Sequence, residues 1–215
     1  MAKKPGSEPV TVTDRNWGSG RPRHASTRIY LLRHGRTPLN AAGALRGHLD
    51  PDLDPVGQLE ASILGDVLAG ENLERIISSP LKRAVATASE VAQRAGLEVE
   101  VDPRFIDRDY GPWAGRPKEE IVARWGSLDD APEIEPERAV LTRSMSALDD
   151  AARQVSRGAL LVVSHDAVNR LLLTALDARL GDAETVPQDT GCFNVVERRG
   201  EEWVVLSVNN IARSQ

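Results

Sequence analysis

The chain has 215 residues, of which 40% are hydrophobic and 27% charged, and it carries a net charge of −5. This length suits one domain with a sizeable core, and the charge gives no reason to expect nucleic-acid binding. No apolar run approaches the roughly 20 residues of a membrane span. The single cysteine, Cys192, excludes an internal disulfide, and the N-terminus lacks an apolar signal core. We therefore expect a cytoplasmic protein.

Residues 1–27 contain five basic and two acidic residues, with several prolines and glycines and no hydrophobic period. Such a composition is typical of a poorly ordered basic arm. The domain is expected to span residues 28–215.

The first regular stretch predicts a strand that runs into a helix. Ile29–Leu32 is apolar and β-branched, as in a buried parallel strand, and Arg33-His34-Gly35 follows directly. Thr37 and Pro38 then match an N-cap and the first helical position. Backbone N–H groups and the Arg33 guanidinium converge at such a turn, which predicts an anion site around His34.

A second strand-to-helix turn follows further along the chain. Asp54-Pro55 starts an amphipathic helix that ends near Gly70, and residues 75–78 form a short strand. Ser79-Pro80 is expected to cap a helix that runs to about Ala95. Lys82 and Arg83 occupy the first turn of that helix, where cations oppose the helix dipole. A broken local rule of this kind often marks a functional site.

The second half predicts an edge strand at 99–101, a polar loop with the carboxylates Asp107 and Asp109, and helices at 118–125 and 137–155. Residues 159–163 form the best buried strand, and Ser164-His165-Asp166 opens a helix over 167–176. Two strands at 192–196 and 203–208 close the chain. Because strand-to-helix turns gather at the carboxyl edge of an open sheet, His34, Arg83 and His165 should meet there. We expect an α/β fold, a single-domain three-layer sandwich with a mostly parallel sheet and helices on both faces.

Cys192 and Arg198 have the spacing of cysteine-dependent phosphatases. That chemistry needs a glycine-rich loop before a helix, whereas the intervening residues predict a strand, so we reject it.

At several motifs the chain resembles the histidine phosphatase superfamily, which includes the phosphoglycerate mutases. The motifs are Arg33-His34-Gly35, Asn40 shortly after it, Arg83 after Ser78-Ser79-Pro80, Gly111, Trp113 and Gly115 after Asp107, and Ser164-His165. The resemblance implies a phosphoglycerate mutase-like fold. It also implies that His34 is the nucleophile that becomes phosphohistidine.

The remaining roles also follow from the resemblance. Arg33, Arg83, His165 and Asn40 would hold the phosphoryl oxygens, and Asp107 would protonate the leaving group. Gly35, Arg36 and Thr37 complete the expected phosphate-binding turn. No metal and no cofactor are expected, because fixed cations neutralise the phosphoryl charge.

Three positions depart from the family pattern. Arg46 replaces a polar residue, and it is either a second anion contact or a solvated loop arginine. Asp107 replaces the usual glutamate, with Asp109 as the fallback proton donor. Asp166 replaces a glycine, and its side chain should point away from the anion.

These residues favour a metal-independent phosphomonoesterase acting on a small phosphorylated metabolite. A cofactor-dependent phosphoglycerate mutase is the alternative, although the segment between Asp107 and His165 is short for one. A catalytically weak phospholigand-binding module is the second alternative. We expect no nucleic-acid or membrane partner, and we leave a homodimer open.

Overall fold

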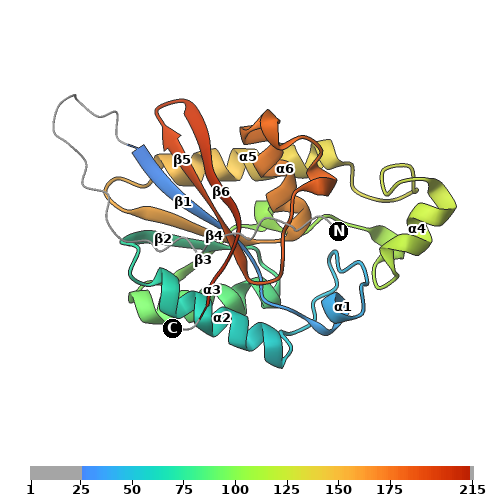
Figure 1. Cartoon of the computed structure of the whole chain (residues 1–215), viewed down its shortest axis with the longest axis horizontal. Coiled ribbons are helices and arrows are strands. Elements are labelled where there is room, and N and C mark those ends of the chain that lie inside the picture. The colour runs from blue at the N-terminus through green and yellow to red at the C-terminus, as the bar shows by residue number, and fades with distance from the viewer. Residues whose placement is uncertain (1–25, 214–215) are drawn as a thin grey trace, which may run out of the picture.

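The computed structural model describes residues 26–213, whose strands form one six-stranded sheet in the order β3-β2-β4-β1-β5-β6 (Figure 1). Strands β3, β2, β4 and β1 run parallel, and β5 and β6 are antiparallel to their neighbours. The mostly parallel sheet is therefore confirmed. The strand bounds are Ser26–Arg33 (β1), Leu73–Ser78 (β2), Val99–Val101 (β3), Ala159–Ser164 (β4), Cys192–Arg199 (β5) and Glu202–Ile211 (β6).

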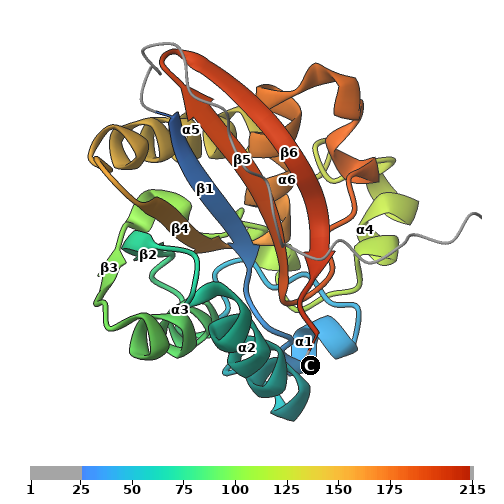
Figure 2. The same cartoon turned by 60° about the vertical axis from the view of Figure 1, so that its left-hand side comes forward.

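Helices cover both faces of this sheet, as Figures 1 and 2 show. Alternate β1 side chains explain the layering, since neighbouring residues of a strand point to opposite faces. Ile29 and Leu31 pack with α5 and α6 on one face, and Tyr30 and Leu32 pack with α2 and α3 on the other. The predicted three-layer sandwich is confirmed. The helix bounds are Pro38–Ala41 (α1), Pro55–Leu68 (α2), Lys82–Ala95 (α3), Lys118–Trp125 (α4), Glu137–Arg153 (α5) and Asp166–Leu176 (α6).

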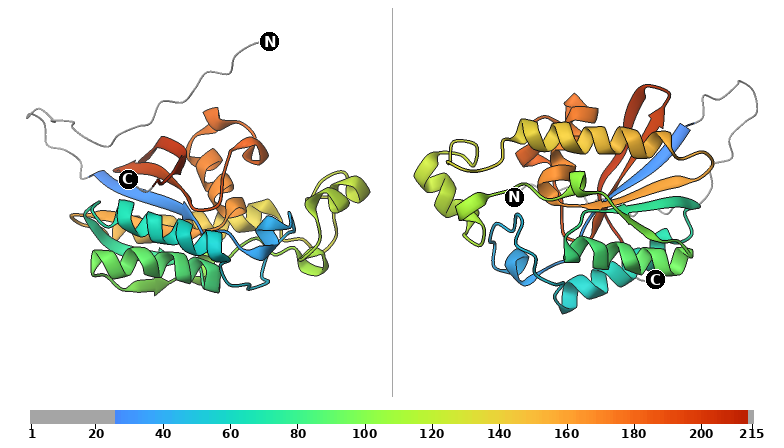
Figure 3. Two further views of the ribbon diagram at one scale, coloured as in Figure 1. Left: turned by 60° about the horizontal axis from the view of Figure 1, so that its bottom comes forward. Right: turned by 180° about the vertical axis from the view of Figure 1, so that it is seen from behind.

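Helix α4 belongs to a lobe that extends from one end of the sandwich (Figure 3). The lobe has its own small apolar cluster, which includes Tyr110, Trp113, Ile121 and Leu128. Leu45, from the loop after α1, packs into the same cluster. That contact places the lobe beside the carboxyl edge of the sheet.

The register of the parallel strands sets which turns become neighbours. Arg33 at the end of β1 pairs with Ser164 at the end of β4, and Ser78 of β2 pairs with Val163. Beyond the strands, the His34 amide donates to the Ser164 carbonyl over 3.1 Å. The turns after β1, β2 and β4 therefore meet at one point of the sheet edge, as predicted.

Strand β1 begins at Ser26, so the predicted domain boundary at residue 28 falls inside a strand. The rest of the predicted basic arm lies outside the described residues. Thr37 caps α1 as predicted, and its hydroxyl accepts a bond from the Asn40 amide. Helix α1 is a single turn of four residues, so its dipole contributes little to anion binding.

The predicted Ser79-Pro80 cap is wrong. Helix α3 begins at Lys82, and the preceding Leu81 makes no capping bond with its side chain. The Asp50 carboxylate instead accepts the Lys82 amide over 2.7 Å. The Ser79 hydroxyl accepts the amide of Leu81, one residue before the helix, over 3.4 Å, and it lies 2.7 Å from His165 Nε2.

No helix within residues 26–213 combines the length and the apolar character that a membrane-spanning helix needs.

Candidate active site

His34 lies at the centre of the site, fully buried directly after β1. Its Nδ1 lies 2.7 Å from the Gly35 carbonyl oxygen, which can only accept, so Nδ1 carries the proton. Nε2 then has a free lone pair and accepts a bond from Arg83 Nε over 3.1 Å. Burial, followed by the charges of Arg83, Arg33 and Arg46, holds the pKa of His34 well below its usual range. The imidazole is therefore neutral, with an unprotonated Nε2.

Arg83 connects the His34 imidazole to a carboxyl group. Its guanidinium is fully buried, and Nη2 donates to Asp107 Oδ2 over 3.1 Å and to the Gly47 carbonyl over 2.9 Å. Nη1 donates to the Leu49 carbonyl over 2.7 Å. The contacts explain why a cation occupies the first turn of α3, against the helix dipole: two backbone carbonyls and an oxygen of the Asp107 carboxyl group accept its hydrogen bonds.

His165 faces His34 across the site, with ring centroids 5.1 Å apart. It is the N-cap residue of α6 and is fully buried. Its Nδ1 has no hydrogen-bond partner and lies 3.8 Å from Asp107 Oδ2. Burial first, then Arg83 and His34, lower the pKa of His165. This second neutral imidazole leaves one ring nitrogen available to a ligand.

Asp107 is the carboxyl group that the structure brings into the site. Its side chain is fully buried, and burial together with the nearby Asp166 raises its pKa although Arg83 acts in the opposite direction. Asp109, the fallback candidate, has a 48% exposed side chain and accepts the Gly111 amide of its own loop. The geometry thus favours Asp107 as the proton donor.

Arg46 and Asp166 correct two expectations. The Arg46 side chain is only 9% exposed, and its Nη2 lies 2.7 Å from Asp166 Oδ1, so a solvated loop arginine is wrong. Asp166 Oδ2 lies 3.6 Å from Arg33 Nη2, so the carboxylate faces the arginines of the site and does not point away. Burial acts to raise the pKa of Asp166, but Arg33 and Arg46 outweigh it and hold that pKa well below its usual range. One carboxylate therefore bridges two guanidinium groups.

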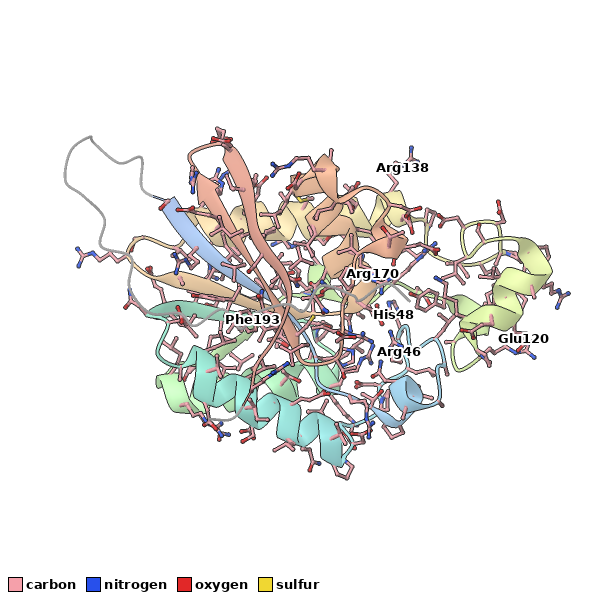
Figure 4. The ribbon with its side chains drawn as sticks, in the orientation of Figure 1. Arg46, His48, Glu120, Arg138, Arg170 and Phe193 are labelled. Atoms are coloured by element: carbon pink, nitrogen blue, oxygen red, sulfur yellow. The ribbon has the colours of Figure 1, made fainter. Side chains whose placement is uncertain are left out.

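A cavity of about 300 Å³ lies next to this ion pair. Arg46 and Asp166 form part of its lining together with Tyr110 and Arg170, whereas His34 is not among the lining residues. Figure 4 shows Arg46 and Arg170 on the same side of the molecule, where α6 and the α4 lobe approach each other. The ion pair therefore borders the cavity, and the buried His34 does not.

The remaining residues of the predicted phosphate turn bond to the protein itself. The Gly35 amide donates to Thr87 Oγ1 over 3.0 Å, and Arg36 Nε donates to Asp54 Oδ2 over 2.8 Å. The Thr37 amide and hydroxyl both donate to Asn40 Oδ1. Their direct contacts with substrate stay predictions.

Sequence reasoning missed the residues that hold Arg33 in place. The Gln188 carbonyl accepts a bond from Arg33 Nη1, and the Gln188 amide in turn donates to Asn194 Oδ1 over 2.7 Å. A signal existed in β5, where the buried positions Cys192, Asn194 and Val196 alternate and the middle one is polar. A buried polar residue of a strand needs a hydrogen-bond partner. Here the partner is Gln188, which also binds Arg33.

Cys192 and Arg198 both lie in β5, so their strand conformation confirms that the cysteine-phosphatase motif is accidental. Burial raises the pKa of the Cys192 thiol to about 12. Among residues 26–213, no group of three or more His, Cys, Asp or Glu side chains is arranged to hold a metal ion.

Comparison with known proteins agrees with this geometry. The family model of the histidine phosphatase superfamily (branch 1) matches residues 29–211. Phosphoserine phosphatase 1 of Hydrogenobacter thermophilus is 29% identical over 193 residues, which cover 85% of this chain and 92% of that protein. Glucosyl-3-phosphoglycerate phosphatase of Mycolicibacterium vanbaalenii is 38% identical over 96 residues, or 45% of this chain and 43% of that protein.

A solved structure shares the fold. The phosphoglycerate mutase from Bacillus anthracis superimposes with a TM-score of 0.79 at 20% identity, over 86% of this chain and 94% of that one. Together with the family match, the buried histidine and arginine residues at the sheet edge identify the chain as a member of the histidine phosphatase superfamily, branch 1, and as a hydrolase of phosphate monoesters.

Proposed function

We propose that this phosphatase hydrolyses a small phosphorylated metabolite through a phosphohistidine on His34, without a metal. The observation that carries the proposal is the hydrogen-bonding state of His34. Its Nδ1 is fixed as a donor to the Gly35 carbonyl, and its unprotonated Nε2 faces the Arg83 guanidinium. A neutral nucleophilic nitrogen beside a fixed cation is what attack on a phosphate dianion requires.

The first step transfers the phosphoryl group to the protein. A phosphoryl oxygen replaces His34 Nε2 as the acceptor of the Arg83 Nε bond, and Arg33 and His165 bind the other oxygens. The Nε2–P bond forms while the P–O ester bond breaks, and the Asp107 proton moves to the leaving oxygen.

The second step returns the site to its starting state. The Asp107 carboxylate takes a proton from a water molecule, whose oxygen attacks phosphorus as the Nε2–P bond breaks. Inorganic phosphate leaves, and Asp107 is again protonated. The raised pKa of Asp107 supports this role, because an acid catalyst must hold its proton until the leaving group departs.

The cavity supports a small leaving group. Its volume of about 300 Å³ is at the lower end of ordinary small-molecule sites, and its lining mixes charged and apolar side chains. The relatives named phosphoserine phosphatase and glucosyl-3-phosphoglycerate phosphatase support a phosphorylated metabolite as the substrate class. Arg46 at the cavity wall would favour a substrate with a second anionic group, once the ion pair with Asp166 opens.

Rapid quenching with a ³²P-labelled phosphomonoester tests the proposal. Wild-type protein should yield an acid-labile, base-stable phosphoprotein whose label maps to His34, and His34→Ala should yield none while keeping its fold. Turnover of 4-nitrophenyl phosphate at mildly acidic pH should be insensitive to EDTA and blocked by vanadate. Label on another residue would refute the nucleophile. Loss of activity on chelation, restored by a divalent ion, would refute the metal-free mechanism.

A further inference from the structure

The loop that carries Asp107 is held through its backbone by one arginine of a distant helix. Arg143, on α5, donates from Nη1 to the Arg104 carbonyl over 2.8 Å and to the Ile106 carbonyl over 2.6 Å. Its Nη2 donates to the carbonyl of Asp107 itself over 3.1 Å. We call residues 104–107 the acid loop.

Side chains from two other elements bind the same loop. Ser164 Oγ, at the end of β4, donates to the Phe105 carbonyl over 2.9 Å. His48 Nε2 lies 3.1 Å from the Asp107 carbonyl. Every carbonyl of the acid loop therefore meets a side-chain donor, and Arg143 serves three of the four. These bonds fix the backbone between the 3-10 turn at Pro103–Phe105 and Asp107, which gives the acid loop the rigidity that proton transfer needs.

The positive charge of Arg143 is paired with the Glu135 carboxylate. Nε and Nη2 form a two-bond fork with the Glu135 carboxylate, each bond 2.9 Å long. Glu135 Oε2 also accepts the Asp109 amide over 3.1 Å. An unpaired cation next to Asp107 would favour its ionised form. The fork lets a guanidinium hold the acid loop without that effect.

We propose that Arg143, neutralised by Glu135, is a positioning residue that fixes the Asp107 carboxyl for proton transfer to the leaving group. The proposal rests on the proposed function, in which Asp107 is the proton donor. Arg143 lies on α5 and does not line the cavity, so it would act on the reaction only through the position of Asp107.

Leaving-group dependence distinguishes positioning from mere stability. A phenolate of low pKa departs without much protonation, whereas an alkyl alkoxide needs the acid. Arg143→Gln and Arg143→Lys should therefore lower kcat for an alkyl phosphate at least tenfold more than kcat for 4-nitrophenyl phosphate. Lysine should restore part of the loss, since it donates hydrogen bonds but cannot form the planar fork. Equal losses on both substrates, or none, would overturn the proposal.

Arg94→Gln is the matched control. Arg94, on α3, also bonds two carboxylates, those of Asp66 and Glu90, but it does so at the protein surface away from the acid loop. Its replacement should leave the ratio of alkyl to aryl turnover unchanged. If Arg143→Gln does not fold, Arg143→Lys and the pH experiment below decide the question.

Glu135→Gln tests whether the Glu135 carboxylate neutralises the charge of Arg143. The amide still accepts from Arg143, but the cation is no longer compensated, so the pKa of Asp107 should fall. The high-pH limb of kcat/KM for an alkyl phosphate should move to lower pH, and the limb for the aryl phosphate should move less. An unmoved limb would overturn the neutralising role. Besides Arg143, the charged or titratable side chains that face the Asp107 carboxyl group are Arg83, Arg46, Tyr110, His165 and Asp166, and His48 contacts its backbone carbonyl.

Asp107→Asn separates failure of this inference from failure of the proposed function. If Asp107→Asn shows the selective loss on alkyl phosphates and the Arg143 variants do not, the positioning role alone is refuted. If Asp107→Asn shows no selectivity, the proton-donor assignment falls, and the positioning role falls with it.

Discussion

At the scale of single residues, two positions that depart from the family pattern contact each other. Arg46 and Asp166 replace a polar residue and a glycine, and they form an ion pair although 120 positions separate them in the chain. The Asp166 carboxylate binds Arg46 and approaches Arg33, so it occupies cationic groups that a phosphoryl group would also use. In the proposed mechanism, substrate binding therefore replaces the Asp166 carboxylate with the phosphoryl group as the anion beside these arginines.

Asp166→Asn should accordingly tighten the binding of inorganic phosphate and of vanadate. A unit charge several ångströms from a dianion costs a few kcal/mol at an effective dielectric constant of about 20, so about tenfold or more in the inhibition constant is expected. The inhibition constants of phosphate and vanadate, measured for the wild type and for Asp166→Asn at the same pH, test this prediction. Weaker binding by Asp166→Asn would show that the carboxylate is needed to hold Arg33 and Arg46 in place.

Asp107 carries the second prediction at this scale. The Asp107→Asn change removes the proton donor and keeps the size of the side chain. Its single oxygen can accept from Arg83 or from the Arg108 amide, which bind different oxygens of Asp107. Hydrolysis of alkyl phosphates should fall roughly a hundredfold or more, and hydrolysis of activated aryl phosphates far less. Asp109→Asn is the control and should affect neither. A selective loss in Asp109→Asn would instead move the acid role to that residue.

At the scale of elements, the phosphate turn is built against the start of α2. Asp54 caps α2 and also accepts a bond from Arg36 Nε, and the Asp54 amide donates to the Arg36 carbonyl over 3.0 Å. Gly57 lies so close to the turn that an added Cβ would stand 2.0 Å from the Arg36 carbonyl oxygen. The helix thus supports the backbone that positions His34.

Gly57→Ala should destabilise the protein and lower turnover together. Alanine is the better helix former by about 1 kcal/mol, but the overlap with backbone cannot be relieved by a side-chain movement. We expect a net loss of roughly 1–3 kcal/mol in the free energy of unfolding, as for other overpacked sites. Gly70→Ala, just beyond the same helix, meets nothing within 4 Å and should be neutral or slightly stabilising. Urea titrations of both variants provide the comparison.

At the scale of the whole molecule, one site contains most of the buried charge of the described chain. His34 and His165 are buried in the neutral form with pKa values well below the usual range, because of burial and the nearby arginines. The unfolded chain binds protons at these histidines near a pKa of about 6.5, and the folded protein does not. Stability must therefore fall as the pH falls through that value.

The free energy of unfolding should decrease between pH 7.5 and 5.5, by up to about 1.4 kcal/mol per pH unit for each histidine. Asp107 acts in the opposite direction, since its raised pKa lets the folded protein take up a proton before the unfolded chain does. Urea unfolding across this pH range measures the slope. His165→Asn should reduce it by about half, and a flat wild-type profile would contradict the neutral state of both histidines.

Local sequence patterns were enough to predict most helices and strands and the residues that gather at the sheet edge. Hydrophobic period, caps and turn residues are local, so β1, α2, β4 and α6 could be predicted within a few residues of their observed bounds. The carboxyl ends of parallel strands lie at the same edge of a sheet, so the turns that contain His34, Arg83 and His165 could be predicted to meet.

The pairing of the buried charges, in contrast, depends on contacts between distant parts of the chain. The ion pair of Arg46 and Asp166, the hold of Arg143 on the acid loop and the use of the Ser79 hydroxyl by His165 join residues that are far apart in the chain. A side chain's partner depends on strand register and on helix packing, which no local pattern contains. For the same reason, the sequence predicted that Ser79 caps the helix and that the Asp166 side chain points away from the anion. In the structure, Ser79 Oγ lies against His165 and the Asp166 carboxylate pairs with Arg46.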